Sequence, residues 1–329
     1  MKAPELVHWS RPGLARHASA NRAIVFVHGI FSDHNTFEAC YDTFVEDVRF
    51  NDFEFFYYDY DYNDSLENNG KLLAKILTKR FGPDDQVVII AHSMGGLVAR
   101  IAIVSERMLF VRCLFLLGTP NVGAIRMAQV SLLAQLVLGT LQVAFAVFPR
   151  KEGIVDLTRA GEILESYRDK SNYAHHVDYV SIPGLYFHEG RSYWELGRDV
   201  ATKVFALLQL GLTVLAVYFP RFAIRLSMPH DGIVEMASNN LVPCVVGRES
   251  EKKDSINFST TSPTTYAHVE PHSCRRLTHI RIHSDRDVIE TIAEIMLTQA
   301  SSTRSRLVMW YEGLSGPRKG RITRVQFRP

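Results

Sequence analysis

The sequence predicts an α/β fold built on a mostly parallel central β-sheet, and two observations lead to this prediction. The first is composition: of 329 residues, 47% are hydrophobic, and 37 Lys and Arg balance 35 Asp and Glu. These values exclude a disordered chain, a collagen-like fibre and a highly basic nucleic-acid binder. The second is the order of sequence patterns: short apolar runs alternate with helical patterns along the first 120 residues, as in βαβ units.

The predicted strands are short apolar runs bounded by turn residues. In chain order they are residues 23–27, 53–58, 86–91, 111–117 and part of 179–187. Helical patterns cover residues 65–81 and 95–107, and a last helix is expected over about 285–297. The Gly-Pro-Asp-Asp turn at residues 82–85 ends the first of these helices.

Cysteine usage and the N-terminal residues bear on the compartment. The four cysteines are far apart and form no Cys-x-x-Cys pair, which argues against a zinc site and a disulfide framework: Cys40, Cys113, Cys244 and Cys274. Residues 1–22 scatter charges and a proline where a secretory signal needs an apolar run. We therefore expect no signal peptide and a cytoplasmic location, with peripheral membrane contact as an option.

Two segments carry no charged residue, namely 127–149 and 204–220, of 23 and 17 residues. The first exceeds the length of about 18 residues expected of a membrane span, but it contains Gln135 and Gln142. We interpret both segments as buried or lid helices; interfacial membrane-binding helices and true spans are the alternatives. The polar segment 247–265 is expected to be a surface loop.

The chemistry centres on Ser93, in the run Ala91-His92-Ser93-Met94-Gly95. This run joins a predicted strand to a predicted helix, and a tight turn there exposes a serine hydroxyl beside a base. The small residues Ala91 and Gly95 relieve crowding in the turn, and the Met94 amide lies where it can bind a developing oxyanion. The alternative is that Ser93 only caps an ordinary helix.

A second loop supports the same chemistry. His28-Gly29-Ile30 follows the first predicted strand, and Gly29 allows the backbone to turn. The Ile30 amide is therefore the expected second oxyanion donor. His28 is expected to orient the loop, with a role as catalytic base as the alternative.

Several motifs together resemble the α/β-hydrolase superfamily. In chain order they are residues 27–30 (VHGI), 91–100 (AHSMGGLVAR), 116–124 (LLGTPNVGA), 231–234 (DGIV) and 278–292 (THIRIHSDRDVIETI). Within the superfamily they are most similar to lipase-like serine esterases, including bacterial triacylglycerol lipases and the GPI inositol-deacylase-like group. The resemblance spans about residues 20–300. It implies an α/β-hydrolase fold, a triad in the order Ser, Asp, His, and no metal or organic cofactor.

The resemblance also implies the two partners of Ser93. Asp231 matches the family's loop carboxylate, which orients the histidine, although a solvated turn aspartate is the alternative. Ser238, nearby, is taken as supporting structure. His279 matches the loop histidine that precedes the last helix, and His272 is its main rival.

The sequence departs from the family pattern at two positions near the site. Asn121 stands where a histidine usually follows Gly-Thr-Pro, so its role stays open between a plain turn and a pocket-shaping residue. Ile280 replaces the glycine expected after the loop histidine. The region also contains His268 and His283 as further, less favoured candidates for the base.

The predicted function is hydrolysis of carboxylic acyl esters, most simply by a lipase or phospholipase at a membrane surface, with a lipid or acyl ester as its partner. The two uncharged segments would cover the mouth of the site as lids. A soluble esterase or thioesterase on a small acyl substrate and a non-catalytic binding protein on a hydrolase scaffold are the rivals. An amidase or acyltransferase would use the same residues.

The predicted domain organisation is one catalytic domain over residues 1–300, with cap insertions at about 121–178 and 189–228. Residues 301–329 would form a tail with seven basic side chains and one acidic. The simplest interpretation is a solvated terminus; contact with anionic headgroups is an alternative, and no nucleic acid is expected. The oligomeric state is left open.

Overall fold

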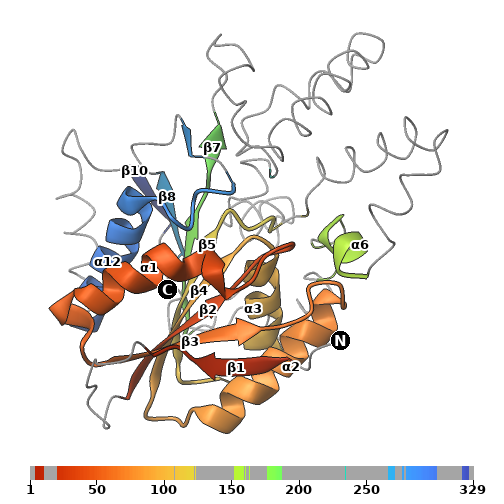
Figure 1. Cartoon of the computed structure of the whole chain (residues 1–329), viewed down its shortest axis with the longest axis horizontal. Coiled ribbons are helices and arrows are strands. Elements are labelled where there is room, and N and C mark those ends of the chain that lie inside the picture. The colour runs from red at the N-terminus through yellow and green to blue at the C-terminus, as the bar shows by residue number, and fades with distance from the viewer. Residues whose placement is uncertain are drawn as a thin grey trace, which may run out of the picture.

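The computed structural model of the chain describes residues 4–10, 21–106, 108–121, 123, 152–158, 160, 163, 176–186, 234, 266–270, 276–277, 279–301 and 321–325. Its centre is an eight-stranded sheet with the order β1-β3-β2-β4-β5-β6-β8-β10. Figure 1 shows this sheet with helices packed against it. A separate two-stranded sheet pairs β7 (Leu185–Tyr186) with β9 (Arg276–Leu277).

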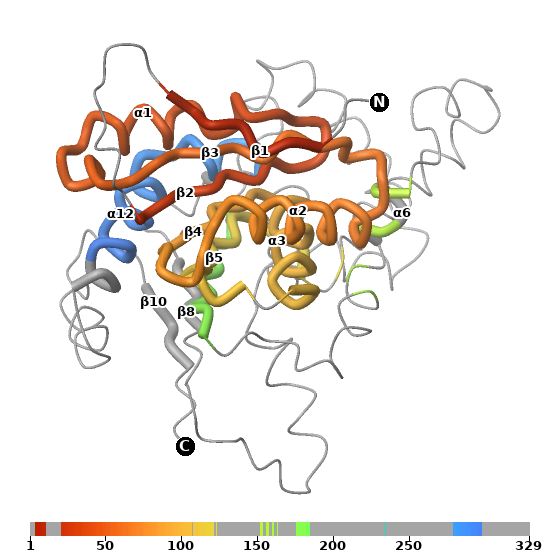
Figure 2. The backbone as a smooth tube through the Cα atoms, turned by 90° about the horizontal axis from the view of Figure 1, so that it is seen from below, coloured from red at the N-terminus to blue at the C-terminus, as the bar shows by residue number. Residues whose placement is uncertain are grey.

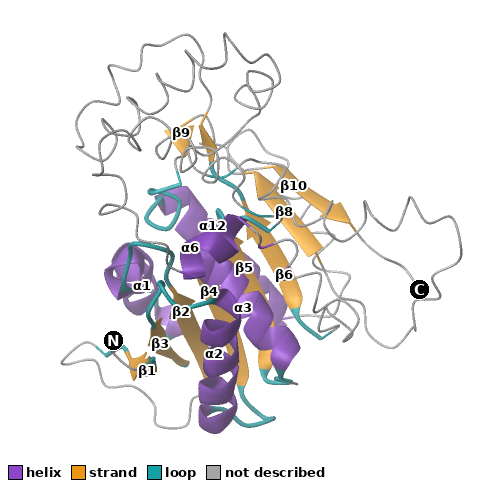
Figure 3. Ribbon diagram, turned by 90° about the vertical axis from the view of Figure 1, so that its right-hand side faces the viewer, coloured by secondary structure: helices purple, strands orange, loops and turns teal. Residues whose placement is uncertain are grey.

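The sheet is mainly parallel and antiparallel only at its two edges. The parallel strands are β2 (Arg22–Val27), β3 (Phe53–Asp59), β4 (Gln86–His92), β5 (Val111–Leu117), β6 (Asp178–Ile182) and β8 (Tyr266–Glu270). The edge strands β1 (Glu5–His8) and β10 (Arg321–Val325) pair antiparallel with β3 and β8. Figure 3 shows β8 and β10 together at the edge of the sheet opposite β1.

Both faces of the sheet are covered by helices, which explains why the central strands are apolar throughout. One face packs against α2 (Leu66–Arg80), α3 (Met94–Ser105) and α6 (Glu152–Thr158). The other packs against α1 (Glu38–Glu46) and α12 (Arg286–Ser301). Figure 2 shows the two groups of helices on opposite sides of the sheet.

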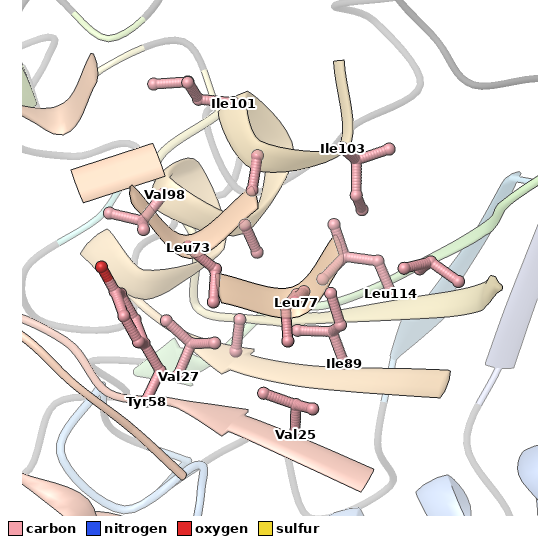
Figure 4. Packing of buried hydrophobic residues seen from close by; sticks show 14 of the residues in the cluster. Val25, Val27, Tyr58, Leu73, Leu77, Ile89, Val98, Ile101, Ile103 and Leu114 are labelled. Carbon is pink, nitrogen blue, oxygen red and sulfur yellow. The ribbon is translucent and has the colours of Figure 1, made fainter. Parts of the chain in front are cut away.

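Residues of β4 alternate between the two cores in the way a strand buried on both faces requires. Ile89 belongs to the core on the side of α2 and α3, and Ile90 to the core on the side of α1 and α12. In Figure 4, Ile89 lies beneath Leu77 of α2, and Leu114 lies beside Leu77. All of these side chains are fully buried, so β4 sits at the centre of the molecule.

The local sequence accounts for α2. The Ser65 hydroxyl accepts a hydrogen bond from the Asn68 backbone N–H at 3.1 Å, which caps the first turn. Lys79 and Arg80 lie in the last turn, where positive charge complements the helix dipole. The helix predicted over 65–81 is thus confirmed.

A parallel sheet, helices on both faces and a serine turn directly after β4 make this an α/β-hydrolase fold, as predicted. Parallel strands present their carboxyl ends at one edge of the sheet, and ligand sites of α/β sheets form there. The loops after β2, β3, β4 and β5 therefore lie on the same side of the molecule. The site is expected at that edge.

Two of the predicted segments gain detail from the structure. The strand expected within 179–187 is present as β6, and Pro183 and Gly184 separate it from β7 (Leu185–Tyr186), because proline has no N–H to give to the ladder. Residues Arg321–Val325, expected in a separate tail, pair with β8 as β10 and thus extend the sheet. The division of the chain at residue 300 otherwise stays a prediction.

Several predicted segments lie outside the described residues, namely 127–149, 204–220 and 247–265. Within the ranges that the structure does describe, no helix is both long and apolar enough to cross a membrane. The short helix α6 falls inside the predicted cap insertion 121–178.

Candidate active site

Ser93 occupies a sharp turn between β4 and α3. Its φ of 53° and ψ of −123° fall in a region that side-chain-bearing residues rarely adopt. Such strain is kept only where the surrounding structure enforces it, and it is concentrated at functional sites. The Ser93 N–H donates to the Leu117 carbonyl at 2.8 Å, so the neighbouring strand β5 helps to hold the turn.

Two glycines allow the chain to pass close to this turn. A Cβ atom on Gly95 would lie 2.3 Å from the carbonyl oxygens of both Val27 and His28, which is far inside contact distance. A Cβ atom on Gly29 would lie 2.9 Å from the Ser93 Cβ. The loop after β2 and the turn after β4 therefore approach each other as closely as backbone allows.

His279 lies against Ser93. Its Nε2 is 2.8 Å from the Ser93 Oγ, and both side chains are buried. His279 comes two residues after β9 (Arg276–Leu277) and begins a turn that leads into α12. With Nε2 unprotonated, the serine hydroxyl donates to it, which is the arrangement that a serine nucleophile needs.

The two predicted oxyanion donors lie on either side of Ser93 in the chain. Met94 is the first residue of α3 and is fully buried. Ile30 is half-buried in the turn after β2, next to Gly29. Because β2 and β4 are neighbouring parallel strands, the loop after β2, which contains Ile30, lies beside the turn after β4, which contains Ser93 and Met94.

The loop after β2 is braced by a tyrosine. The Tyr60 hydroxyl donates to the His28 carbonyl oxygen at 2.7 Å, and the two rings stack with centroids 4.4 Å apart. The His28 Nδ1 donates to the Gly29 carbonyl oxygen at 2.8 Å. Burial lowers the pKa of His28 and raises the pKa of Tyr60 well above its usual value, so both rings stay neutral. These contacts fit the loop-orienting role expected of His28.

His92 also contributes to the site, and the sequence analysis did not single it out. It precedes Ser93, and its Nε2 lies 2.9 Å from the backbone carbonyl oxygen of His279. Its position next to Ser93 was the only available signal. The contact joins residues 187 positions apart, which no local pattern reveals.

The residues after β5 form a buried polar turn. The Arg100 Nη1 donates to the Asn121 Oδ1 at 3.0 Å, and both residues are almost fully buried. Thr119 is packed against Gly96, where a Cβ atom would lie 2.0 Å from the threonine Oγ1. Asn121 therefore ties the Gly-Thr-Pro turn to α3.

The helix α6 reaches the same region. A Cβ atom on Gly153 would lie 3.0 Å from the Met94 Cε and 2.2 Å from the Tyr62 carbonyl oxygen. Leu157 of α6 is fully buried in the core beside α2 and α3. Part of the predicted insertion 121–178 thus packs beside the start of α3.

Two large apolar side chains next to the site are exposed to solvent. Phe31 follows Ile30 and is 57% exposed, with a left-handed φ of 55°. Ile280 follows His279 and is 60% exposed. Val48 and Leu109 are also exposed, but they precede β3 and β5. They therefore lie toward the amino ends of the parallel strands, away from the site.

Asp231, Ser238 and His272 lie outside the described residues, and His268 is described only as a backbone position in β8. His283 lies in the turn between His279 and α12. In the described part of the chain, no cluster of three or more His, Cys, Asp or Glu side chains could hold a metal ion.

Comparisons with known proteins give a family of unknown function. The family model described as "Domain of unknown function (DUF7379)" matches residues 2–186, which include Ser93 but not His279. No curated protein matches the sequence significantly.

Three solved structures with a similar chain course are distant from this chain in sequence. The mature lipase BlEst2 of Bacillus licheniformis has 15% identity and a TM-score of 0.49, over 89% of this chain and 98% of that one. The lin2722 gene product of Listeria innocua has 12% identity and a TM-score of 0.46, over 86% and 95%. The metagenomic carboxyl esterase MGS0156 has 15% identity and a TM-score of 0.42, over 71% of this chain and 64% of that one.

Proposed function

The chain belongs to this family of unknown function, DUF7379, and we propose that it is a serine hydrolase that cleaves carboxylic acyl esters. The observation that carries the proposal is the 2.8 Å contact between His279 Nε2 and Ser93 Oγ at a strained turn after the central strand. A serine N-capping an ordinary helix has no need of an imidazole at its hydroxyl, nor of a backbone conformation with positive φ.

The proposed reaction proceeds through an acyl-enzyme. The Ser93 Oγ attacks the ester carbonyl carbon while its proton passes to His279 Nε2. The tetrahedral oxyanion is bound by the Ile30 and Met94 amides, and loss of one such donor costs about 3 kcal/mol of transition-state stabilisation. His279 then protonates the departing alcohol.

Deacylation repeats these steps with water as the nucleophile. His279 takes a proton from the water molecule as it attacks the acyl carbonyl, and returns it to Ser93 Oγ as the acid leaves. In this proposal Asp231 completes the triad by accepting a hydrogen bond from the imidazole and stabilising the imidazolium. No step requires a metal or an organic cofactor.

A fluorophosphonate probe tests this proposal directly. The probe is expected to label the wild-type protein and to fail on Ser93→Ala. Ser105→Ala, which removes another hydroxyl at the end of α3, is the matched control and should be labelled like the wild type. A folded wild-type protein that is not labelled would favour the non-catalytic scaffold instead.

For the substrate, we propose an acyl lipid at a membrane surface, as in the lipase-like group. Support comes from Phe31 and Ile280, which expose apolar surface beside the two loops of the site. Exposing such side chains to water is unfavourable, whereas contact with acyl chains removes them from it. The packing of α6 beside Met94 also favours an insertion that borders the site.

Rates on short-chain and long-chain esters, with and without phospholipid vesicles, test the lipid proposal. We expect vesicles to raise the rate on long-chain esters, and Phe31→Ser with Ile280→Ser to reduce that increase by about tenfold. Val48→Ser removes an exposed apolar side chain toward the opposite edge and should have no effect. Indifference to chain length and vesicles would favour a soluble esterase or thioesterase.

A further inference from the structure

His92 connects the nucleophile strand to the loop of His279. It is the last residue of β4, where its backbone pairs with Leu117 of β5, and its side chain is 7% exposed. Its Nε2 lies 2.9 Å from the His279 carbonyl oxygen. Because a carbonyl oxygen only accepts hydrogen bonds, Nε2 carries the proton and Nδ1 does not.

Packing alone does not explain a histidine at this position. The His92 Nδ1 is buried and has no hydrogen-bond partner among the residues that the structure describes. It faces Gly29, where a Cβ atom would lie 3.1 Å away. A buried acceptor without a partner lowers stability, so an apolar side chain would suit a purely structural role better. The hydrogen bond to His279 is the interaction that offsets this loss.

His92 is also neutral. Burial lowers its pKa well below the usual value, and His279 and His283 act in the same direction. The ring centroids of these two histidines are 4.9 and 5.0 Å from that of His92. An uncharged His92 therefore does not oppose the positive charge that His279 acquires when it takes the serine proton.

We propose that His92 is a positioning residue, which holds the backbone of His279 so that the imidazole stays within hydrogen-bond reach of Ser93. The inference rests on the proposed hydrolase function. Its physical basis is rigidity: β4 is paired on both sides, whereas His279 lies in a turn, so the strand supports the loop. A displacement of about 1 Å in such a site lowers the rate by on the order of 100-fold.

The test compares three substitutions at this position. His92→Leu removes the donor and keeps an apolar side chain of similar size. His92→Gln places an amide N–H near the position of Nε2, whereas His92→Asn is too short to reach it. We expect His92→Leu to lower kcat by about 10- to 100-fold with KM within about twofold, His92→Gln to recover most of kcat, and His92→Asn to recover little.

Rates are normalised to the fraction of each protein that a fluorophosphonate probe labels, which removes the effect of misfolded material. If His92→Leu does not fold, the contrast between Gln and Asn still decides. Equal kcat values for His92→Gln and His92→Asn, or a kcat of His92→Leu within about threefold of wild type, would overturn the inference. Failure of the probe on wild type would instead count against the hydrolase proposal.

Nitrogen-15 NMR of the histidines gives a readout independent of catalysis. The expected signature is a neutral His92 in the Nε2–H tautomer at pH 7, because burial lowers its pKa. A neutral ring with its proton on Nδ1 would contradict the hydrogen bond to the His279 carbonyl, and a doubly protonated ring would contradict the neutral state.

Discussion

Gly95 shows how tightly the residues around Ser93 are constrained. The α3 backbone at Gly95 passes so close to the carbonyls of Val27 and His28 that there is no room for a methyl group. Those carbonyls end β2 and begin the loop of Ile30. The close spacing between the Ser93 turn and the loop of Ile30 therefore requires glycine, which has no side chain, at position 95.

Gly95→Ala is expected to destabilise the protein by about 3 kcal/mol or more, because backbone atoms rather than flexible side chains must move to accept the methyl group. Thermal unfolding monitored by circular dichroism measures this. Gly82→Ala is the matched control: its Cβ would meet nothing closer than the Asp85 Oδ2 at 3.9 Å, so the Tm should change by about 1 °C or less. Equal effects of the two substitutions would contradict the close approach.

His283 should make stability depend on pH. Burial lowers its pKa from 6.5 to about 4. In the unfolded chain it takes a proton below about pH 6.5, whereas in the folded protein it does so only near pH 4, so stability is full above that window and falls as the pH drops through it. Between pH 7 and pH 5 the expected loss from this group is about 2 kcal/mol.

Urea unfolding at pH 7 and pH 5 checks this dependence. His283→Gln should reduce the difference between the two pH values, because its side chain does not ionise. His8→Gln, which changes an exposed histidine of β1, should leave the difference as it is in the wild type. A His283→Gln protein with an unchanged difference would show that other groups dominate.

The sequence analysis assigned Ser93 and His279 to one site, and the two side chains lie in contact in the structure. The motif around each residue carried that information. His92 and Tyr60 could not be found in the same way, because each acts through a backbone carbonyl of a distant segment, and a carbonyl carries no residue-specific signal. Asp231 stays a prediction.

At the scale of elements, α6 is attached to the start of α2. The Asp156 Oδ2 accepts a hydrogen bond from the Leu66 backbone N–H at 2.9 Å, 90 residues away. Gly153 donates to the Asn63 carbonyl at 3.3 Å. A carboxylate at a helix N-terminus satisfies a free N–H and interacts favourably with the helix dipole. Two elements that belong to different parts of the chain are thus joined.

Asp156→Ala is expected to cost about 1 kcal/mol of stability, and Asp156→Asn about half of that because it keeps an acceptor but not the charge. Urea unfolding of both variants gives the comparison. Glu152→Ala, at the exposed start of the same helix, is the control and should be close to neutral. A larger loss for Glu152→Ala than for Asp156→Ala would argue against the cap.

The elements that the sequence predicted well are those with strong local patterns. The runs that became β2 to β5 and the helices α2 and α3 have boundaries within about two residues of the expected ones. The missed strands β1, β8, β9 and β10 are short or lie at a sheet edge, where stability comes from pairing with a distant strand rather than from the strand's own residues.

At the scale of the whole molecule, β10 closes one side of the sheet. It pairs antiparallel with β8 over five residues, from Arg321 opposite Glu270 to Val325 opposite Tyr266. Without it, β8 would present unpaired backbone groups, which favour association between chains. Part of the basic C-terminal segment, Arg321–Val325, therefore contributes to the fold.

A chain ending at Ser301 is expected to have a lower Tm than the full chain, by several degrees, and a greater tendency to aggregate on heating. A chain ending at Gln326 keeps β10 and should behave like the full-length protein. Light scattering during a thermal scan measures both quantities. Equal behaviour of the two shortened chains would show that β10 adds nothing to the sheet.

The contact between Ser93 and His279 has a consequence for how the protein is made. These residues are 186 positions apart, so the pair can form only after the chain has been synthesised as far as residue 279. The strands β1 to β5 and the helices α2 and α3 all precede this position in the chain, so most of the sheet is synthesised before the residue that contacts Ser93. On the proposed mechanism, Ser93 is expected to be inactive until this contact forms.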